Sequence, residues 1–430
     1  MSRSIVHSTD MAWVLDPAEP FAGTVKDGGT IVARVSPGCW GAMITPDYPS
    51  GHEVTRPIAV EGAKVGDAIV LKIRKITVLS LATTSGTDVP REGHYVGDPF
   101  VAKRCPKCGK INPVTYVEGV GPSAIRCKEC GTPVNPFELE NTYTVLFDEE
   151  RQVGVTVPSA VAAEIAKEAD HFSALPPESR QYSVNLIARG DLPGLIAPLR
   201  PMVGNVGTCP AVRMPASHNA GDFGSFLVGA PHDYALVEEE LSKRTDGHLD
   251  VNEVVEGAVL IVPVKVDGGG IYVGDVHAMM GDGEIAGHTT DVSAEVVIDV
   301  KVLKGLNLDG PILLPVPEDL PKIARPHTPG ILERARRTAA QYGFALEEEA
   351  LPIQVIGSGK DLNAATANGL ERMSKLTGLP LPEVRNRCTI TGQVDIGRLP
   401  GVVQITMLVP KLILERLELW NMVTEHYHQE

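Results

Sequence analysis

Short runs in which hydrophobic and polar residues alternate dominate this chain, and they predict β-strands more often than helices. The clearest run is Ala294–Leu303, where aliphatic residues alternate with charged ones. Less regular runs occupy Thr30–Val35 and Val402–Val409. Because successive side chains of a strand point to opposite faces, these runs predict sheets with one face buried in a core.

Two similar sequence phrases suggest that the chain contains two related β units. "VEGAKVGDAIVLKI" (Val60–Ile73) joins two strand-like runs through a Gly-Asp turn, which predicts a hairpin or a corner. A similar phrase, "VEGAVLIVPV", returns at Val255–Val264. Two short matches do not establish a duplication, but both predict strands.

Helical periodicity is confined to a few segments. Val157–Glu168 predicts a short helix, and Ile331–Tyr342 and Asp361–Leu376 have the strongest helical patterns, followed by a short helix near Pro382. Residues 192–231 are rich in Gly and Pro and have little periodicity. They predict either a long surface loop or backbone organised around a site.

Length and composition support a mainly β architecture of more than one unit. The chain has 430 residues, enough for two or three domain-sized units, and its 43 Gly and 34 Pro require many turns. The expected fold class is therefore α+β, predominantly β. The expected units are an N-terminal β unit, a cysteine-rich insert, a central β domain with the candidate site and a C-terminal α/β segment, at residues 1–100, 101–140, 141–310 and 311–430.

The net charge of the chain argues against some classes of binding partner. The chain has 39 Lys+Arg and 54 Asp+Glu, a formal net charge of −15. This argues against a general surface for nucleic acid or anionic membrane, since both need basic patches. No apolar run approaches the ~18 residues needed to cross a bilayer, and the first residues lack the apolar region of a secretory signal. We expect a cytoplasmic protein with no membrane partner.

Four of the seven cysteines form two Cys-x-x-Cys pairs, separated by 18 residues and each followed by Gly. They are Cys105, Cys108, Cys127 and Cys130. In a chain without an export signal this pattern predicts a zinc ribbon, in which four thiolates complete a tetrahedral, structural Zn²⁺ site. A closed site of this kind has no open position for catalysis, so its expected role is to fold the insert.

The insert is also basic, which leaves its further role open. Its cations are Lys103, Arg104, Lys107, Lys110, Arg126 and Lys128. The simplest interpretation is a structural insert or a contact between subunits or with a protein partner. Contact with nucleic acid is a weaker alternative, because the whole chain is acidic.

Ionisable side chains are densest in a segment of 17 residues. They are Asp275, His277, Asp282, Glu284, His288 and Asp291. Residues two apart in an extended segment face the same side, so Asp275 can converge with His277, and Asp282 with Glu284. Imidazole and carboxylate groups suit Zn²⁺ or a similar divalent ion with an open position. The alternative is a simple hairpin turn with solvated carboxylates.

A second polar group precedes this segment, in "PASHNAGD". His218, Asn219 and Asp222 lie there in a Gly-rich stretch without periodicity. Such a loop can supply a third metal ligand and an amide donor toward a substrate oxygen. A histidine in a polar loop is also commonly just solvated.

Taken together, these segments resemble the acetamidase/formamidase family. "VGDVHAMMGDGEIAG" (Val273–Gly287) is similar to its most specific motif, Gly-Asp-x-His-x-x-x-Gly-Asp-Gly-Glu. "VTRPIAVEGAKVGDAIVLKI" (Val54–Ile73) resembles its N-terminal β corner, and "LRPMVGNVGTCPA" (Leu199–Ala211) its central Pro/Gly segment. "ASHNAGDFG" resembles its histidine–glycine–asparagine loop, and the Asp361–Leu376 region its C-terminal helix.

The resemblance implies β-sandwich or barrel-like units with an α/β portion, a homo-oligomer, and hydrolysis of short amides to acid and ammonia. The residues that match its motifs are Asp275, His277, Asp282, Glu284 and His218. The chain departs from the family at His218–Asp222, where the family has His-Gly-Gly-Asn, and in carrying the cysteine insert. These departures leave the substrate open.

The leading hypothesis is metal-assisted amide hydrolysis. A divalent ion, expected to be Zn²⁺, is predicted at His277 and His218 with Asp275 or Asp282. Glu284 is the expected general base, with Asp282 in support and Asn219 or a glycine NH near Gly281 as oxyanion donor. The remaining expected substrate contacts are Gly283, Asp222, His288 and Asp291. The competing hypothesis is a non-catalytic binding or assembly subunit on the same scaffold.

Overall fold

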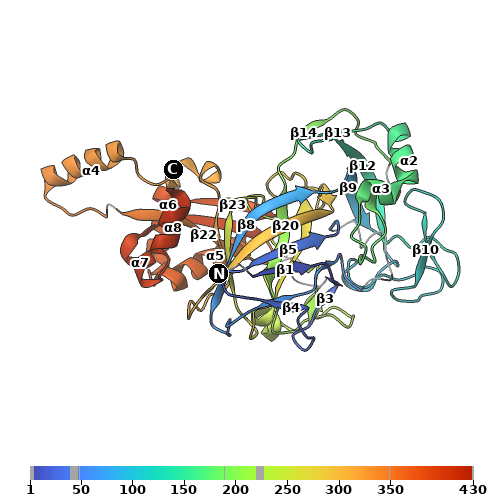
Figure 1. Ribbon diagram of the computed structural model, residues 1–430, viewed down its shortest axis with the longest axis horizontal. Coiled ribbons are helices and arrows are strands. Elements are labelled where there is room, and N and C mark those ends of the chain that lie inside the picture. Colours follow the sequence, from blue (N-terminus) through green and yellow to red (C-terminus); the bar gives the residue numbers. More distant parts are fainter. Residues whose placement is uncertain are drawn as a thin grey trace.

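The computed structural model describes residues 4–38, 47, 49–187, 189–218, 227–347 and 349–428. A nine-stranded sheet runs through the middle of the molecule (Figure 1), and it is antiparallel except for its first strand pair. In sheet order its strands are β1 (Ile5–Ser8), β5 (Thr30–Val35), β20 (Ala294–Leu303), β8 (Ala68–Val78), β17 (Val259–Pro263), β21 (Ile312–Leu314), β22 (Ala350–Ser358), β24 (Val402–Pro410) and β23 (Gln393–Arg398).

A second sheet is organised around β18 (Ile271–His277), a strand whose residues are all buried. The other members are short, and several of them pair only with β18. They are β2 (Met11–Ala12), β6 (Val54–Thr55), β7 (Ile58–Val60), β4 (Gly23–Val25), β15 (Met202–Thr208) and β19 (Asp291–Val292). This sheet carries most of the candidate site.

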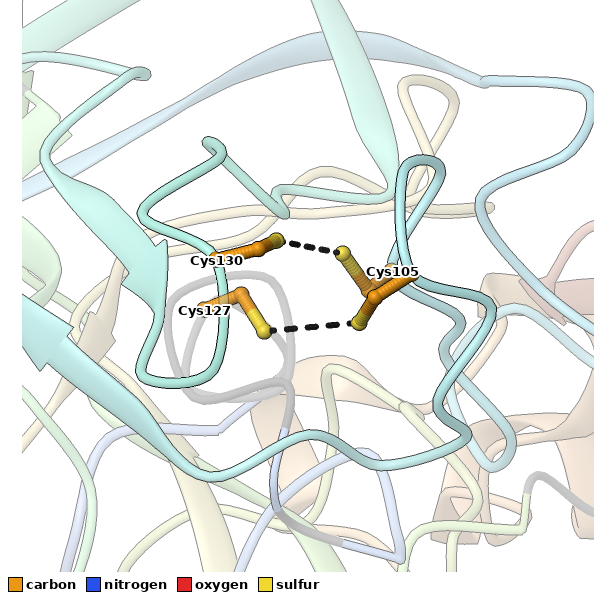
Figure 2. A group of neighbouring side chains, drawn as sticks. Cys105, Cys127 and Cys130 are labelled. Carbon is orange, nitrogen blue, oxygen red and sulfur yellow. Dashed lines mark hydrogen bonds between the residues drawn. The ribbon is translucent and has the colours of Figure 1, made fainter.

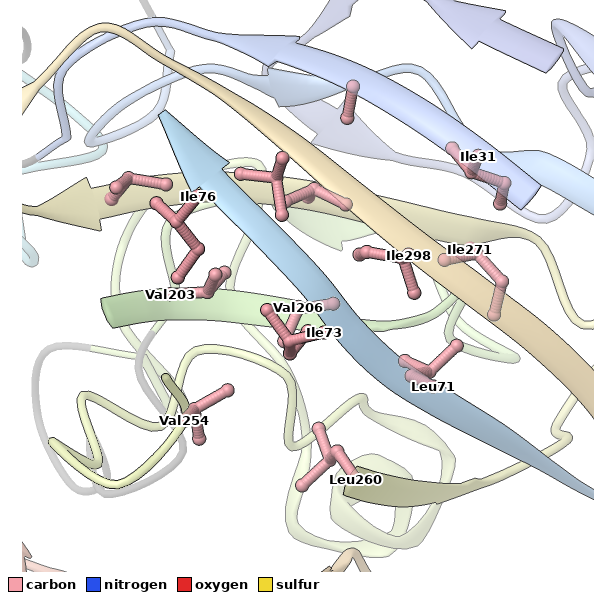
Figure 3. Packing of buried hydrophobic residues seen from close by; sticks show 14 of the residues in the cluster. Ile31, Leu71, Ile73, Ile76, Val203, Val206, Val254, Leu260, Ile271 and Ile298 are labelled. Carbon is pink, nitrogen blue, oxygen red and sulfur yellow. The ribbon is translucent and has the colours of Figure 1, made fainter. Parts of the chain in front are cut away.

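The main hydrophobic core lies between these two sheets (Figure 3). Ile73 of β8 and Ile298 of β20 pack there with Val206 of β15 and Ile271 of β18. All four side chains are essentially inaccessible to water. Since burial of one such side chain contributes about 1.5–3 kcal/mol, this core fixes the two sheets against each other. The expected sandwich is confirmed.

A third sheet of four antiparallel strands lies beside the sandwich. Its order is β14 (Ile196–Pro198), β13 (Val153–Thr156), β12 (Phe137–Phe147) and β9 (Ala82–Pro90). Near it lie α2 (Ser159–Lys167), α3 (Ala169–Ser173), the 3₁₀ turn η1 (Val184–Ile187) and the cysteine-rich hairpin β10 (Thr115–Val117) and β11 (Ile125–Cys127). A further pair joins β3 (Val14–Leu15) to β16 (Met214–Pro215).

Helices cover the C-terminal strands. They are α5 (Leu362–Thr377), α6 (Leu381–Thr391), α7 (Lys411–Arg416) and α8 (Trp420–Tyr427), while α4 (Pro329–Tyr342) projects from the body (Figure 1). There are also short 3₁₀ helices, among them η3 (Glu238–Lys243), η4 (Pro317–Asp319) and η5 (Lys322–Ala324). Asp361 caps α5 by accepting a 2.8 Å hydrogen bond from the Ala364 backbone NH, and Gly378 ends it in the left-handed region. In the part of the chain that the structure describes, no helix is both long and apolar enough to span a bilayer.

The predicted helices at Ile331–Tyr342 and Asp361–Leu376 are confirmed, and the structure is predominantly β with helices at the C-terminus. The first related phrase proves to be a corner, because β7 and β8 belong to different sheets. The second phrase supplies β17, which pairs directly with β8. The nine-stranded sheet takes strands from the N-terminal, central and C-terminal segments, so the four-unit division stays a prediction about the sequence.

For residues 192–231 the sequence predicts either a long surface loop or backbone organised around a site. The surface-loop alternative is wrong for Met202–Thr208, which form the buried strand β15 and pair with β18 from Met202↔His277 to Thr208↔Ile271. The sequence of β15, MVGNVGT, is buried on both faces and therefore has no alternation by which it can be recognised.

Candidate active site

The backbone of β18 breaks its regular pairing at the centre of the site. β15 and β18 pair on either side of Gly204 and Asp275, but these two residues are not paired with each other. Asp275 has a φ of 54°, in the left-handed region. A Cβ added to Gly204 would lie 2.9 Å from Asp275 Oδ2 and 2.5 Å from Asp250 Oδ1. Only glycine at this position lets both carboxylates approach β15 so closely.

The segment after η3 brings a histidine and a second carboxylate to the same place. The backbone NH groups of Leu249 and Asp250 both donate to the Gly204 carbonyl, at 2.8 and 3.1 Å. This fixes His248 and Asp250 next to Asp275. His52, just before β6, completes the group with its ring 4.8 Å from that of His248.

Four side chains thus surround the carboxylate of Asp275, and together the group is His52, His248, Asp250, Asp275 and His277. His248 Nε2 lies 2.8 Å and His52 Nε2 3.7 Å from Asp275 Oδ2, and His277 Nε2 lies 3.2 Å from Oδ1. They form two sets of three ligand atoms, His52/His248/Asp275 and Asp250/Asp275/His277, that share Asp275. Within each set all atoms lie within 4.8 Å of one another, so each set can bind a metal ion.

The hydrogen bonds of two histidines fit metal ligation. His248 Nδ1 lies 2.7 Å from the Ser217 carbonyl, and His52 Nδ1 lies 3.1 Å from the Glu53 carbonyl. A carbonyl accepts only from a protonated nitrogen, so each Nε2 faces Asp275 as the ligand atom. Within the described ranges the buried oxygens of Asp275 accept no well-aligned hydrogen bond. Such orphaned donors and acceptors are expected where a cation belongs.

The electrostatics reflect this crowding of buried charge. Burial lowers the pKa of His52 to about 4, so this imidazole is neutral. Burial also opposes the charging of His248, but Asp250 and Asp275 outweigh it and raise the pKa of His248 to about 10. Although burial opposes its ionisation, neighbouring histidines hold the pKa of Asp275 well below its ordinary value. The carboxylates therefore need nearby positive charge, from protonated imidazoles or from a bound cation.

Asp291 faces the same nitrogen of His277 as the shared carboxylate does. Its Oδ1 is 3.1 Å from His277 Nε2, which also lies 3.2 Å from Asp275 Oδ1, and both residues are buried at the β18–β19 pairing. Burial raises the pKa of Asp291 to about 7, against the opposing effect of His277. Asp291 therefore adjoins the ligand group, although it belongs to neither set of three ligand atoms.

Glu284 is held by an arginine from a distant strand. Arg398 Nε, on β23, donates to Glu284 Oε2 at 2.7 Å and also lies 3.1 Å from Asp250 Oδ2. The turn containing Gly283 docks on β23, since Gly283 NH donates to the Gly397 carbonyl at 3.1 Å. Burial and Asp250 raise the pKa of Glu284, while Arg398 opposes them. Glu284 and the ligand group are therefore connected through one guanidinium.

Three residues of this group have strained backbones. Asp250, Asp275 and Glu284 have φ values of 48°, 54° and 43°, and only seven non-glycine residues in the described chain have positive φ. Left-handed conformations of such residues cost about 1–3 kcal/mol each and persist where the surroundings impose them. Their coincidence on three buried acids indicates a functional site.

A cavity of about 420 Å³ lies beside Met279 and Met280, which closely follow His277 in the sequence, and no residue of the two ligand sets lines it. It is lined by Tyr143 of β12, Leu195, Met279, Met280 and Thr290, among others. Burial raises the pKa of Tyr143, and the charges of Asp291 and Glu284 raise it further, so Tyr143 stands between cavity and site. The mostly apolar lining suits a small uncharged ligand.

The four predicted zinc ligands converge in the insert (Figure 2). Cys105 Sγ lies 3.5 Å from Cys130 Sγ, and Cys108 Sγ lies 3.9 Å from Cys127 Sγ. These separations are too long for disulfides of about 2.05 Å, but they match the ~3.8 Å expected of thiolates bound tetrahedrally at about 2.3 Å. Backbone NH groups of Lys107 and Cys108 also donate to Cys105 Sγ. The group fits the zinc ribbon that the spacing predicts.

Comparison with known proteins then decides the family. The profile of the Acetamidase/Formamidase family matches residues 38–416. The chain belongs to this family. A putative formamidase from Schizosaccharomyces pombe is 28% identical over 159 residues, which cover 29% of this chain and 37% of that protein.

Solved structures of the family have the same fold. A predicted acetamidase/formamidase from Thermoanaerobacter tengcongensis aligns with a TM-score of 0.54 and 18% identity, over 97% of this chain and 99% of that one. An acetamidase from Yersinia enterocolitica aligns with a TM-score of 0.55 and 15% identity, over 96% and 94%. At these identities the likeness concerns the fold.

The predicted site residues of the family motif separate in the structure. Asp275, His277, Glu284 and Asp291 come together, whereas Asp282 is exposed and belongs to neither ligand set. Gly281 lines the cavity, and Gly283, with φ of 86°, shapes the turn that docks on β23. His288 is buried elsewhere, with Nε2 2.8 Å from Asp88 Oδ2.

The predicted ligand His218 is buried and belongs to neither described ligand set, and its role as a metal ligand stays a prediction. Its neighbours Asn219 and Asp222 lie outside the described residues, and their roles stay predictions. The histidines that join Asp275 in these sets are His52, His248 and His277.

Sequence reasoning missed His52, His248, Asp250 and Arg398. One signal was present, because Asp246-Gly-His-Leu-Asp250 repeats the residue types of the motif in acetamidases and formamidases, a histidine between acids next to glycine. His52 and Arg398 stand alone in the sequence, and only the fold brings them to the site.

Proposed function

We propose that this chain is a metal-dependent hydrolase of carbon–nitrogen bonds in small linear amides, releasing ammonia or an amine. The observation that carries the proposal is the buried group of three histidines and two aspartates around the carboxylate of Asp275. Membership of the Acetamidase/Formamidase family and the similarity to a putative formamidase support the reaction class.

The proposed ligands are His52, His248, Asp250, Asp275 and His277. Three imidazole nitrogens and carboxylate oxygens suit Zn²⁺ and similar ions. A divalent ion bound there would polarise the amide carbonyl and lower the pKa of a bound water. Because the two sets share Asp275, the centre can hold one ion, or two ions bridged by this carboxylate.

We assign the general base to Glu284. Its carboxyl group is buried, and burial raises its pKa toward the range in which a carboxylate accepts and returns a proton efficiently. Arg398 holds Oε2, while Oε1 is buried and has no hydrogen-bond partner in the described ranges. Oε1 is then the atom that takes the proton of the attacking water and delivers it to the leaving nitrogen.

The cavity beside Tyr143 and Met279 is the proposed position of the acyl group. A lining of leucine, methionine and tyrosine side chains favours a short apolar chain over a charged one. The substrate is therefore a small aliphatic amide, and its chain length is to be read from relative rates across a homologous series.

The test is release of ammonia from formamide, acetamide, propionamide and butyramide, with the metal content of each preparation measured. Wild type is compared with Glu284→Gln, His277→Ala and the control His7→Ala, whose histidine is exposed on β1. Loss of a general base typically costs about 10²–10⁴-fold in kcat. Equal activity of wild type and Glu284→Gln at equal metal content would remove Glu284 from the mechanism.

The non-catalytic alternative predicts zinc only in the ribbon. It is not favoured, because it gives no reason to bury two aspartates with left-handed backbone, Asp250 and Asp275, beside three histidines. The further expectations, a homo-oligomer, a protein partner of the basic ribbon and a cytoplasmic location, stay predictions. The same elemental analysis distinguishes the two hypotheses, since the enzyme holds metal beyond the four cysteines.

A further inference from the structure

A second cavity, of about 600 Å³, lies apart from the proposed metal centre. It is bounded by residues 241–246, by the end of β17 and by β22 and α5. No residue of either histidine-containing ligand set lines it. On a chain whose net charge is −15, its lining is unexpectedly cationic. The basic residues there are Lys243, Arg244, Lys265, Arg372 and Lys375.

The carboxylate of Asp246 pairs with the two buried guanidinium groups, while that of Asp309 acts on Arg372 and Lys265 without a direct contact to either in the described structure. Arg244 donates to Oδ1 of Asp246, and Arg372 Nη2 donates to Oδ2 at 2.5 Å. Their side chains are 6% and 10% exposed. The ammonium of Lys265 donates to the backbone carbonyls of Ser242 and Arg244, at 2.9 and 2.5 Å. The lining of the cavity therefore sets five basic side chains against two carboxylates, those of Asp246 and Asp309.

The outer part of the cavity does not correct this imbalance. Lys375 pairs with Asp309 at 2.5 Å, and its side chain is 73% exposed. Arg372 also donates to the Ile356 carbonyl at 2.7 Å, but its buried Nε has no hydrogen-bond partner among the described residues. A buried donor left without a partner destabilises the fold, and an anion at this position would remove that cost.

The excess positive charge is visible in the electrostatics. Burial, with the neighbouring Arg372, lowers the pKa of Arg244 to about 9. Burial, Arg244 and Arg372 together lower the pKa of Lys265 to about 7. Buried like charges are costly unless a counter-charge neutralises them, and a bound anion supplies that counter-charge.

We propose that this cavity is a binding site for a small anionic molecule, whose phosphate or carboxylate group lies between Arg244, Lys265 and Arg372. Guanidinium groups present paired NH donors that match the oxygens of either anion. A volume of about 600 Å³ falls within the range of small-molecule sites and exceeds what one inorganic ion fills. The ligand is therefore an organic phosphate or a small carboxylic acid, distinct from the neutral amide proposed for the other cavity.

The test is calorimetric titration and thermal unfolding of the full chain with potassium phosphate, glycerol 3-phosphate and succinate, each against potassium chloride of equal ionic strength. We expect a saturable rise of Tm with at least one of these anions and not with chloride. The phosphate and carboxylate probes distinguish the two sources of anionic oxygen.

Two variants locate the binding. Arg372→Met and Lys265→Met should each weaken binding at least tenfold, while Arg337→Met, whose side chain is exposed on α4, leaves it unchanged. If Arg372→Met does not fold, Lys265→Met carries the test, since its ammonium contacts only carbonyls in the cavity wall. Shifts equal to those in chloride, or affinity retained in both variants, would overturn the proposal. A different result would also overturn the proposal. If the wild-type protein is a dimer that binds none of the anions, and if Lys265→Met makes that dimer dissociate, then a second copy of the chain fills the cavity.

Discussion

The buried ammonium of Lys103 donates a hydrogen bond of 2.9 Å to the backbone carbonyl of Ser50. Lys103 stands two residues before the zinc-ribbon cysteine Cys105, and Ser50 two residues before His52 of the proposed metal centre. Ser50 Oγ in turn lies 3.1 Å from Ser217 Oγ, and the Ser217 carbonyl binds His248. The ribbon is thus connected to two proposed metal ligands through a short series of hydrogen bonds.

This connection predicts that Lys103→Met weakens the metal centre without emptying the ribbon. Methionine fills a similar volume but cannot hold the Ser50 carbonyl, so His52 and His248 lose part of their support. Partners that orient metal ligands typically contribute about 10–100-fold to metal affinity or activity. We expect a fall of that size in both, with ribbon zinc retained. The control is Lys110→Met, an exposed ribbon lysine that pairs with Glu129 on the ribbon itself. If both variants match wild type, the ribbon and the centre are independent.

Removal of the ribbon zinc has a different expected effect. Cys105 and Cys127 pack with Phe137 of β12 and Val184 of η1 in one hydrophobic cluster. A Cys105→Ser/Cys108→Ser variant should therefore lose one zinc per chain and also lower Tm. The control is Cys388→Ser, a cysteine outside the ribbon. Zinc content and differential scanning calorimetry measure the effects, and an unchanged Tm with zinc lost would show that the insert is not coupled to the fold.

Gly38 tests the geometry of the centre directly. A Cβ at this position would lie 1.5 Å from Asp275 Oδ1 and 3.1 Å from Asp291 Oδ1. Gly38→Ala must therefore displace the carboxylate that both ligand sets share. We expect metal content to fall to that of the ribbon and kcat/KM to fall at least 100-fold, while the circular dichroism spectrum is retained. Gly330→Ala, where an added Cβ meets nothing within 4 Å, is the control. Wild-type metal content in Gly38→Ala would contradict the proposed ligand set.

The sequence predicted those features that depend on local pattern. Ala294–Leu303 forms β20, and the helix expected over Asp361–Leu376 is α5, because alternation and helical periodicity act over a few residues. The ribbon was predictable for the same reason, since its ligands come in pairs with fixed spacing. Of the candidate centre, the sequence indicated Asp275, His277 and Glu284, which lie close together in one motif.

The rest of the centre depends on contacts between distant segments. Arg398 is the last residue of the C-terminal strand β23, and it reaches Glu284 because Gly283 docks on that strand. Asp282 appeared equivalent to Glu284 in an alternating pattern, but the left-handed backbone at Glu284 ends the alternation and leaves Asp282 exposed. A period of two predicts which side chains share a face only while the strand stays extended.

Glu253 provides a prediction on pH that does not depend on a metal. Its side chain is 8% exposed and accepts a hydrogen bond from the buried Gln404. Burial, followed by the nearby carboxylates of Asp282, Asp395 and Asp319, raises its pKa to about 7. The folded state therefore holds a proton on Glu253 that the unfolded chain, with an ordinary pKa near 4.3, has already released.

Proton linkage decides whether stability rises or falls with pH. Between the unfolded pKa and about pH 7 the folded state binds more protons than the unfolded state, so stability falls as pH rises through this window. From pH 6 to pH 8.5 this residue should lower the free energy of unfolding by about 1–2 kcal/mol. Glu253→Gln removes this loss, because a neutral amide can occupy the same position. We expect its Tm to exceed that of wild type at pH 8.5 by more than at pH 6. Glu295→Gln, an exposed position on β20, is the control. Parallel pH profiles for wild type and Glu253→Gln would show that Glu253 is ionised in the folded protein throughout.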